Sequence, residues 1–150
     1  MPTPELCTEE EVSELVHRFY ARVRKDAVLG PIFDRHVADW NVHMPKMVAF
    51  WSSALRGSKS YHGTPMPVHC ALPDLQDSMF LRWLDLFEQT ANALPNQAMA
   101  ERAIMLSQRI AQSLWYGYQL RRDPDRMAED LPIRTSTAST ESVASTVTSE

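Results

Sequence analysis

Apolar residues recur every three or four positions in four stretches of this chain, which is the spacing of amphipathic helices. The first stretch places on one face Val12, Leu15, Val16, Phe19 and Val23. Thr8 and Glu11 precede this face with the spacing of a capping box. We therefore expect a first helix that starts after Thr8 and runs to about Lys25.

The second stretch combines apolar and aromatic residues with one histidine on a single side. Its members are Trp40, His43, Met47, Phe50, Trp51, Ala54 and Leu55. Asp39 or Asn41 can cap the start of this helix, and Gly57 is a plausible end. Pro45 lacks a backbone donor, so the helix must start late, near Asn41, or bend at the proline.

Two further helices are expected in the second half of the chain. One starts between Asp74 and Asp77 and carries an apolar face made of Met79, Phe80, Trp83, Leu84, Phe87 and Ala91. The other has Asn96 as its cap and a stripe made of Met99, Ala103, Leu106, Ile110, Leu114 and Trp115. Between the first two helices, residues 28–33 read as a tight corner followed by a short helical turn. No strand pattern occurs, so we predict an all-α fold, either a small bundle or a globin-like packing.

The periodicity ends near Arg122, and residues 135–149 are mainly Ser and Thr. Such a segment buries too little apolar surface to offset the entropy of ordering it. We therefore predict a folded domain over residues 1–121 and a disordered tail over residues 122–150.

Composition narrows the function classes. The net charge of −4 argues against a nucleic-acid-binding protein, which would normally present a basic face. No apolar run approaches the roughly 18 residues of a membrane span, and the first residues lack the features of a secretory signal. Cys7 and Cys70 suggest no disulfide framework. We therefore expect a cytoplasmic protein.

Candidate chemistry centres on the loop of residues 61–73, where three prolines and a glycine surround His69. A histidine beside apolar residues is more often a hydrogen-bonded core residue than a ligand, yet a proximal histidine also holds haem iron in many proteins. Tyr20, His43 and Trp83 lie on three different helices, each beside an apolar stripe. If these stripes face one cavity, a flat apolar cofactor fits there with polar atoms above it. The chain lacks a Cys-x-x-Cys-His motif, so any haem would be held without covalent bonds.

Four stretches, in this order, resemble the group III truncated haemoglobins. They are residues 19–26 with 29–33, residues 40–46 with the Phe50–Trp51 pair, residues 61–65 with His69, and residues 82–87. The resemblance extends over about residues 12 to 118. The first two groups of that family carry Gly-Gly pairs, which this chain lacks.

The resemblance implies a two-on-two helical sandwich around haem b, with a specific role for each matching residue. It implies that His69 is the proximal iron ligand and that Phe33 packs on the porphyrin. It implies a distal set of Tyr20, His43 and Trp83. The other predicted cofactor-binding residues are Lys46, which would pair with a haem propionate, and Met47, Phe50, Trp51 and Tyr61. Pro45 and the Ser/Thr-rich tail depart from the family pattern.

The predicted small ligands are O2, NO, CO or peroxide. Hydrogen bonds from the distal donors would slow oxygen release, which suits nitric-oxide or peroxide detoxification, with a reductase as partner, better than oxygen delivery. Two alternatives stay open at this point. One is a haem-based gas or redox sensor that signals through the tail, and the other is a cofactor-free helical interaction module.

Overall fold

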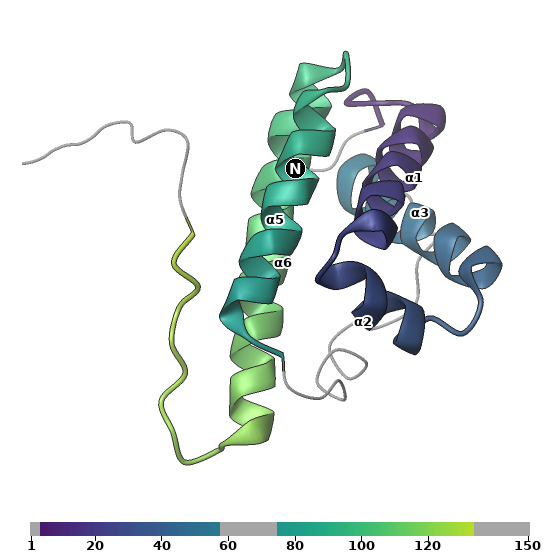
Figure 1. Ribbon diagram of the computed structural model, residues 1–150. Coiled ribbons are helices and arrows are strands. Elements are labelled where there is room, and N and C mark those ends of the chain that lie inside the picture. The colour runs from purple at the N-terminus through teal and green to yellow at the C-terminus, as the bar shows by residue number, and fades with distance from the viewer. Residues whose placement is uncertain (1–3, 58–74, 134–150) are drawn as a thin grey trace, which may run out of the picture.

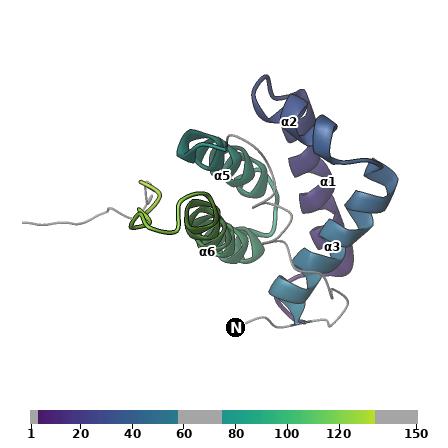
Figure 2. The ribbon, with the colours of Figure 1, turned by 90° about the horizontal axis from the view of Figure 1, so that it is seen from below.

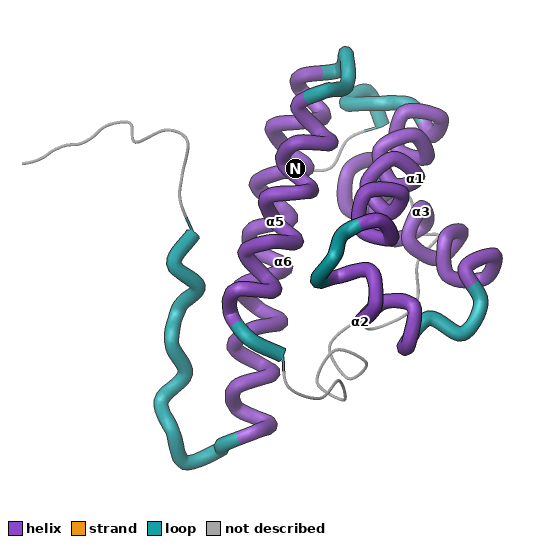
Figure 3. Tube along the Cα trace, in the orientation of Figure 1, coloured by secondary structure: helices purple, strands orange, loops and turns teal. Residues whose placement is uncertain are grey.

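The computed structural model describes residues 4–57 and 75–133. These ranges contain α1 (Glu9–Lys25), α2 (Leu29–His36), α3 (Trp40–Arg56), α5 (Asp77–Asn92) and α6 (Gln97–Arg122). No strand occurs in either range, as Figure 3 shows. The prediction of an all-α fold is confirmed.

The helices form two layers. α5 and α6 pack side by side along most of their length, while α1 packs on α2, α3 and α5 (Figure 1). α3 completes the contact between the layers by touching α6, and Figure 2 shows the α5–α6 pair facing the group of α1, α2 and α3. This arrangement agrees with the expected two-on-two sandwich. No helix in the described ranges has the length and hydropathy needed to cross a membrane.

α1 starts and ends where the sequence pattern places it. The Thr8 N–H donates to the Glu11 carboxylate at 2.8 Å, and the Glu11 N–H donates to the Thr8 hydroxyl at 3.1 Å. This reciprocal capping box satisfies two donors at the helix start. Its five predicted apolar residues are all fully buried and supply much of the main core.

The remaining helix starts agree with the pattern, with one exception. Asp39 caps α3 by accepting from Asn41 N–H at 2.9 Å, and Pro45 lies inside the helix. Asn96 caps α6 by accepting from Met99 N–H at 3.0 Å. For α5 the expected capping bond is missing, because Gln76 occupies the cap position and its side chain makes no capping bond there.

The connection from α1 to α2 is a tight corner, as expected. The helical turn expected after it is longer than predicted, because α2 is a helix of eight residues. Its second residue, Gly30, lies against the end of α1. A Cβ atom at this position would lie 2.7 Å from the carbonyl oxygen of Arg24, which is too close for any side chain. Glycine thus lets α2 start immediately beside α1.

After α6 the chain to Ile133 is extended and returns beside α6, as Figure 1 shows. Leu131 in this segment is buried, with 4% of its surface exposed. Residues 134–150 lie outside the described ranges, so tail disorder and the boundary between residues 121 and 122 stay predictions.

Candidate functional site

A hollow of about 530 Å³ lies between the two layers, bounded by α2, the start of α3, α5 and the later part of α6. Its volume is within the usual range for small-molecule and cofactor sites. The wall is mainly apolar and includes Leu29, Ile32, Phe33, Phe80 and Leu114. Such a wall suits a flat, largely apolar molecule.

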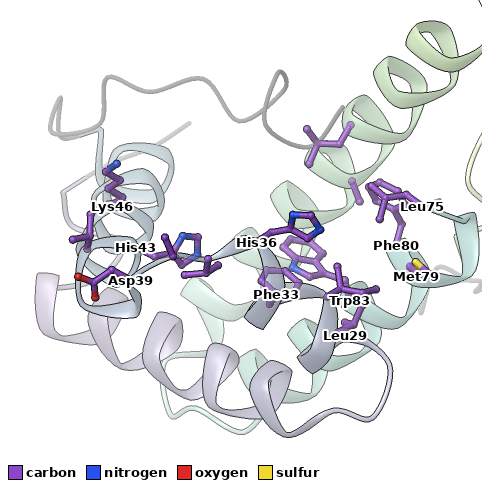
Figure 4. A pocket seen from close by; sticks show the side chains of 16 residues that line it. Leu29, Phe33, His36, Asp39, His43, Lys46, Leu75, Met79, Phe80 and Trp83 are labelled. Atoms are coloured by element: carbon purple, nitrogen blue, oxygen red, sulfur yellow. The ribbon is translucent and has the colours of Figure 1, made fainter. Parts of the chain in front are cut away.

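Four of the predicted site residues line this hollow, and they come from three helices. Phe33 is on α2, His43 and Lys46 are on α3, and Trp83 is on α5. Figure 4 shows the His43 imidazole and the Lys46 amine at one end, and Phe33 near Trp83 in the middle of the wall. The fold therefore brings together residues that are up to 50 positions apart in the chain.

Tyr20 lies directly behind this wall. Its ring meets His43 at 5.4 Å, Phe33 at 5.9 Å and Trp40 at 5.9 Å between ring centroids. The residue is 6% exposed, and burial raises the pKa of its phenol above the ordinary value. The phenol therefore keeps its proton over the physiological pH range and can donate a hydrogen bond. A tyrosine beside an apolar stripe usually lies at the surface boundary with its hydroxyl in water, but Tyr20 is buried.

Trp83 is held in position by two phenylalanines from the core. Phe19 meets its indole edge-on, with ring centroids 5.3 Å apart and planes at 89°. Phe87 stacks on it at 5.7 Å with planes at 17°. Such aromatic pairs each stabilise by about 0.5–1.5 kcal/mol beyond area burial, so the indole is a rigid part of the wall.

The remaining predicted α3 residues lie further along the helix, toward its C-terminal end. Met47 and Phe50 are half-buried and pack against the main core, while Trp51 is buried and stacks on Phe87 at 4.9 Å. None of the three belongs to the described wall of the hollow. Tyr61 and His69 lie outside the described residues, so their roles stay predictions.

Asp26 braces the layer of α1 and α2 against α5. One of its carboxylate oxygens accepts from Arg82 Nε at 2.6 Å, from Leu29 N–H at 2.9 Å and from Val28 N–H at 3.1 Å. The hydrogen bond from Arg82, followed by those from the two backbone groups, lowers the pKa of Asp26 to about 2, although burial opposes this shift. The brace lies beside two wall residues, since Leu29 and Trp83 both line the hollow.

Sequence reasoning gave no site role to His36 in the wall or to Trp40 beside it. His36, the last residue of α2, lines the hollow and is one helical turn beyond Phe33. Trp40 stacks near Phe33 at 6.5 Å, and the Arg24 guanidinium lies 4.5 Å from the centre of the Trp40 ring. The spacing from Phe33 to His36 was visible in the sequence, but the resemblance gave His36 no role.

The chain matches a globin family model and a known haemoglobin over most of its length. The model of the bacterial-like globin family matches residues 5–113 of the chain. The group 3 truncated haemoglobin ctb of Campylobacter jejuni is 35% identical over 121 residues, which are 76% of this chain and 95% of that protein. The chain belongs to the group III truncated haemoglobins.

A solved structure agrees with this assignment. The crystal structure of the group III truncated haemoglobin from Campylobacter jejuni matches this globin with a TM-score of 0.67 at 35% identity. The match covers 72% of this chain and 88% of that chain. The predicted globin-like sandwich is therefore confirmed.

Membership in the family means that this globin binds haem and small gaseous ligands such as O2. The described residues fit a haem. The hollow offers apolar walls for the ring, and His43 and Trp83 are hydrogen-bond donors on its wall. Lys46 also lines it and can pair with an acidic group of the cofactor. The prediction of haem binding is confirmed over the alternative of a cofactor-free helical module.

Proposed function

We propose that this globin holds haem b through His69 and retains small ligands for reaction instead of carrying oxygen. The reaction that the site supports best is conversion of nitric oxide and O2 to nitrate, with peroxide reduction as a second chemistry. The observation that carries the proposal is the position of Tyr20, a buried, protonated phenol that packs against His43 in the wall.

The residues proposed to hold the haem surround the hollow. Phe33 would pack on the ring and Lys46 would pair with a propionate, since both line the space. We propose that the cofactor extends along α3 beyond the described wall. It would there contact four further pocket residues: Met47, Phe50, Trp51 and Tyr61. When bound, the haem supplies an iron atom that takes up diatomic ligands or peroxide and exchanges electrons with them.

Tyr20 is proposed as the main distal donor. Burial is the cause of the raised pKa of its phenol, so the hydroxyl keeps its proton and can donate to a bound ligand. A ligand that accepts this hydrogen bond within the buried wall gains stability. A bond to a ligand with partial negative charge is worth about 1.5–3 kcal/mol, or roughly tenfold to a hundredfold in retention.

His43 and Trp83 are proposed to complete this distal set from two other helices. The Trp83 indole can only donate, and its two stacked neighbours hold it in place. The His43 ring is fixed between Tyr20 and Trp40, which it meets at 5.4 and 5.3 Å. Donors that packing already holds in place lose little conformational freedom when a ligand binds. Most of their hydrogen-bond energy is therefore available to slow ligand release.

Slow release favours reaction over transport. Conversion of O2 and nitric oxide to nitrate consumes one electron in each turnover, so the proposal includes a reductase or another electron donor as partner.

The test is nitrate production by the ferrous, oxygenated protein after nitric oxide is added. Wild type should form a nitrate for each haem, whereas Tyr20→Phe should form less because oxygen leaves before nitric oxide reacts. Tyr116→Phe, which alters a half-buried tyrosine on α6, is the matched control. Full nitrate yield from Tyr20→Phe would contradict the assigned role of this phenol. Nitrate from neither protein, together with rapid peroxide consumption, would favour the second chemistry.

A further inference from the structure

The extended segment after α6 is fastened to the outer side of the α5–α6 pair. Figures 1 and 2 show it beside α6, on the side away from α1 and α3. The family model ends at residue 113, so this segment lies beyond the part of the chain that it matches. We call residues 126–133 the strap.

Two glutamine side chains of α6 hold the strap by its backbone. The Gln119 amide donates to the Glu129 carbonyl at 2.9 Å, and its oxygen accepts from the Glu129 N–H at 3.0 Å. The Gln112 side chain, two turns earlier on α6, accepts from the Leu131 N–H at 2.8 Å. Three hydrogen bonds from side chains to one extended backbone define a single register for the strap.

Leu131 is the apolar anchor of the strap. It is 4% exposed and belongs to one buried cluster with Phe80, Leu84, Ala111 and Leu114. Phe80, Ala111 and Leu114 also line the hollow that takes the haem. The same side chains therefore contact the strap side of the α5–α6 pair and the haem side.

We propose that the strap is a built-in clamp on the rear wall of the haem hollow, and that strap docking and haem retention reinforce each other. Packed interiors transmit small shifts, so losing Leu131 loosens the side chains that face the cofactor. Coupling of this kind is reciprocal, because a haem that stabilises the wall must also stabilise the docked strap. The proposal rests on haem filling this hollow, as in the proposed function.

The strap also gives the Ser/Thr-rich residues that follow it a physical link to the ligand site. Ile133 packs at the edge of the same cluster, immediately before them in the sequence. A change that pulls the strap away would weaken haem retention, and haem loss would release the strap.

The test compares two full-length variants that place the same charge at two positions of the strap. Leu131→Asp puts a carboxylate into the buried cluster, whereas Met127→Asp alters a side chain that is 87% exposed. Haemin loss is measured as transfer from each reconstituted protein to excess apomyoglobin. Strap release is measured as trypsin cleavage between Arg126 and Met127, with and without haemin.

The proposal predicts that Leu131→Asp loses haemin about tenfold faster than wild type, while Met127→Asp loses haemin at the wild-type rate. It also predicts that haemin slows cleavage after Arg126 by about tenfold in wild type and much less in Leu131→Asp. Equal rates of haemin loss from wild type, Leu131→Asp and Met127→Asp would overturn the coupling. A wild-type cleavage rate that haemin does not change would also overturn it.

A third variant and the haemin uptake of wild type separate the possible outcomes. Gln119→Ala removes two of the three hydrogen bonds and leaves the buried cluster intact, so it should speed both cleavage and haemin loss even if Leu131→Asp fails to fold. Wild type that took up no haemin would refute the proposed function together with the coupling. Normal haemin uptake with unchanged loss in Gln119→Ala and Leu131→Asp would refute the clamp alone.

Discussion

The Tyr20 phenol ring meets the His43 imidazole edge-on, with ring centroids 5.4 Å apart and planes at 90°. Tyr20 comes from α1 and His43 from α3, so this contact forms only when the two helices cross. It places a protonated phenol next to the one histidine of α3 that lines the hollow. The pair therefore joins the core to the ligand site.

The first prediction concerns oxygen release. Tyr20→Phe keeps the buried ring but removes the hydroxyl, so oxygen dissociation from the ferrous protein should accelerate by roughly tenfold to a hundredfold. Stopped-flow measurement after rapid mixing with a competing ligand gives this rate. Tyr116→Phe should leave it unchanged, and equal rates in Tyr20→Phe and wild type would exclude Tyr20 as a donor.

The second prediction concerns Lys46, an exposed residue at the edge of the hollow. An ion pair in contact with solvent contributes only about 0–1 kcal/mol, so Lys46→Ala should speed haemin loss by no more than about fivefold. The effect should shrink at high salt because solvent ions screen the pair. Lys25→Ala, which removes an exposed lysine at the end of α1, is the control. A loss as fast as that expected for Leu131→Asp would show that Lys46 does more than pair with a propionate.

The third prediction concerns the Asp26 brace between α2 and α5. Asp26→Asn should lower the free energy of unfolding at neutral pH by about 1 kcal/mol, because the Arg82 bond to a carboxylate is replaced by a weaker bond to an amide oxygen. Denaturant unfolding measures this change. Asp125→Asn, an exposed residue after α6, should have no comparable effect.

The same brace gives a defined pH dependence. The pKa of Asp26 is about 2 in the folded protein, below the ordinary aspartate value, so the unfolded chain takes up a proton first as the pH falls. The stabilisation is complete above about pH 4 and is lost as the pH falls toward 2. Asp26→Asn should lack this component, so the two stability curves should converge in acid. Curves that stay parallel down to pH 2 would show that Asp26 is not the titrating group.

Sequence periodicity predicted the helices well because three of the four apolar stripes begin at a capping residue. Thr8 with Glu11, Asp39 and Asn96 mark helix starts through hydrogen bonds between residues two or three positions apart, which a sequence displays directly. The start of α5 was predicted only as a range, Asp74 to Asp77, because Gln76 at the cap position makes no such bond.

Contacts between distant residues were harder to anticipate. The bond from Arg82 to Asp26 spans 56 positions, and nothing in either local sequence indicates it. His36 was overlooked because its short helix reads as a corner, and the strap because Leu131 and Ile133 are two apolar residues in a polar stretch. The resemblance supplied the distal residues, since periodicity alone assigns Tyr20 and Trp83 to ordinary packing.

The measurement that tests the central claim most directly is the absorption spectrum of the haemin-reconstituted protein in its ferric, ferrous and CO-bound forms. Wild type and His36→Ala should show a Soret band with histidine coordination. His69→Gly should lose that signature and regain it when free imidazole is added. A normal spectrum in His69→Gly, or loss of the signature in His36→Ala instead, would contradict the account.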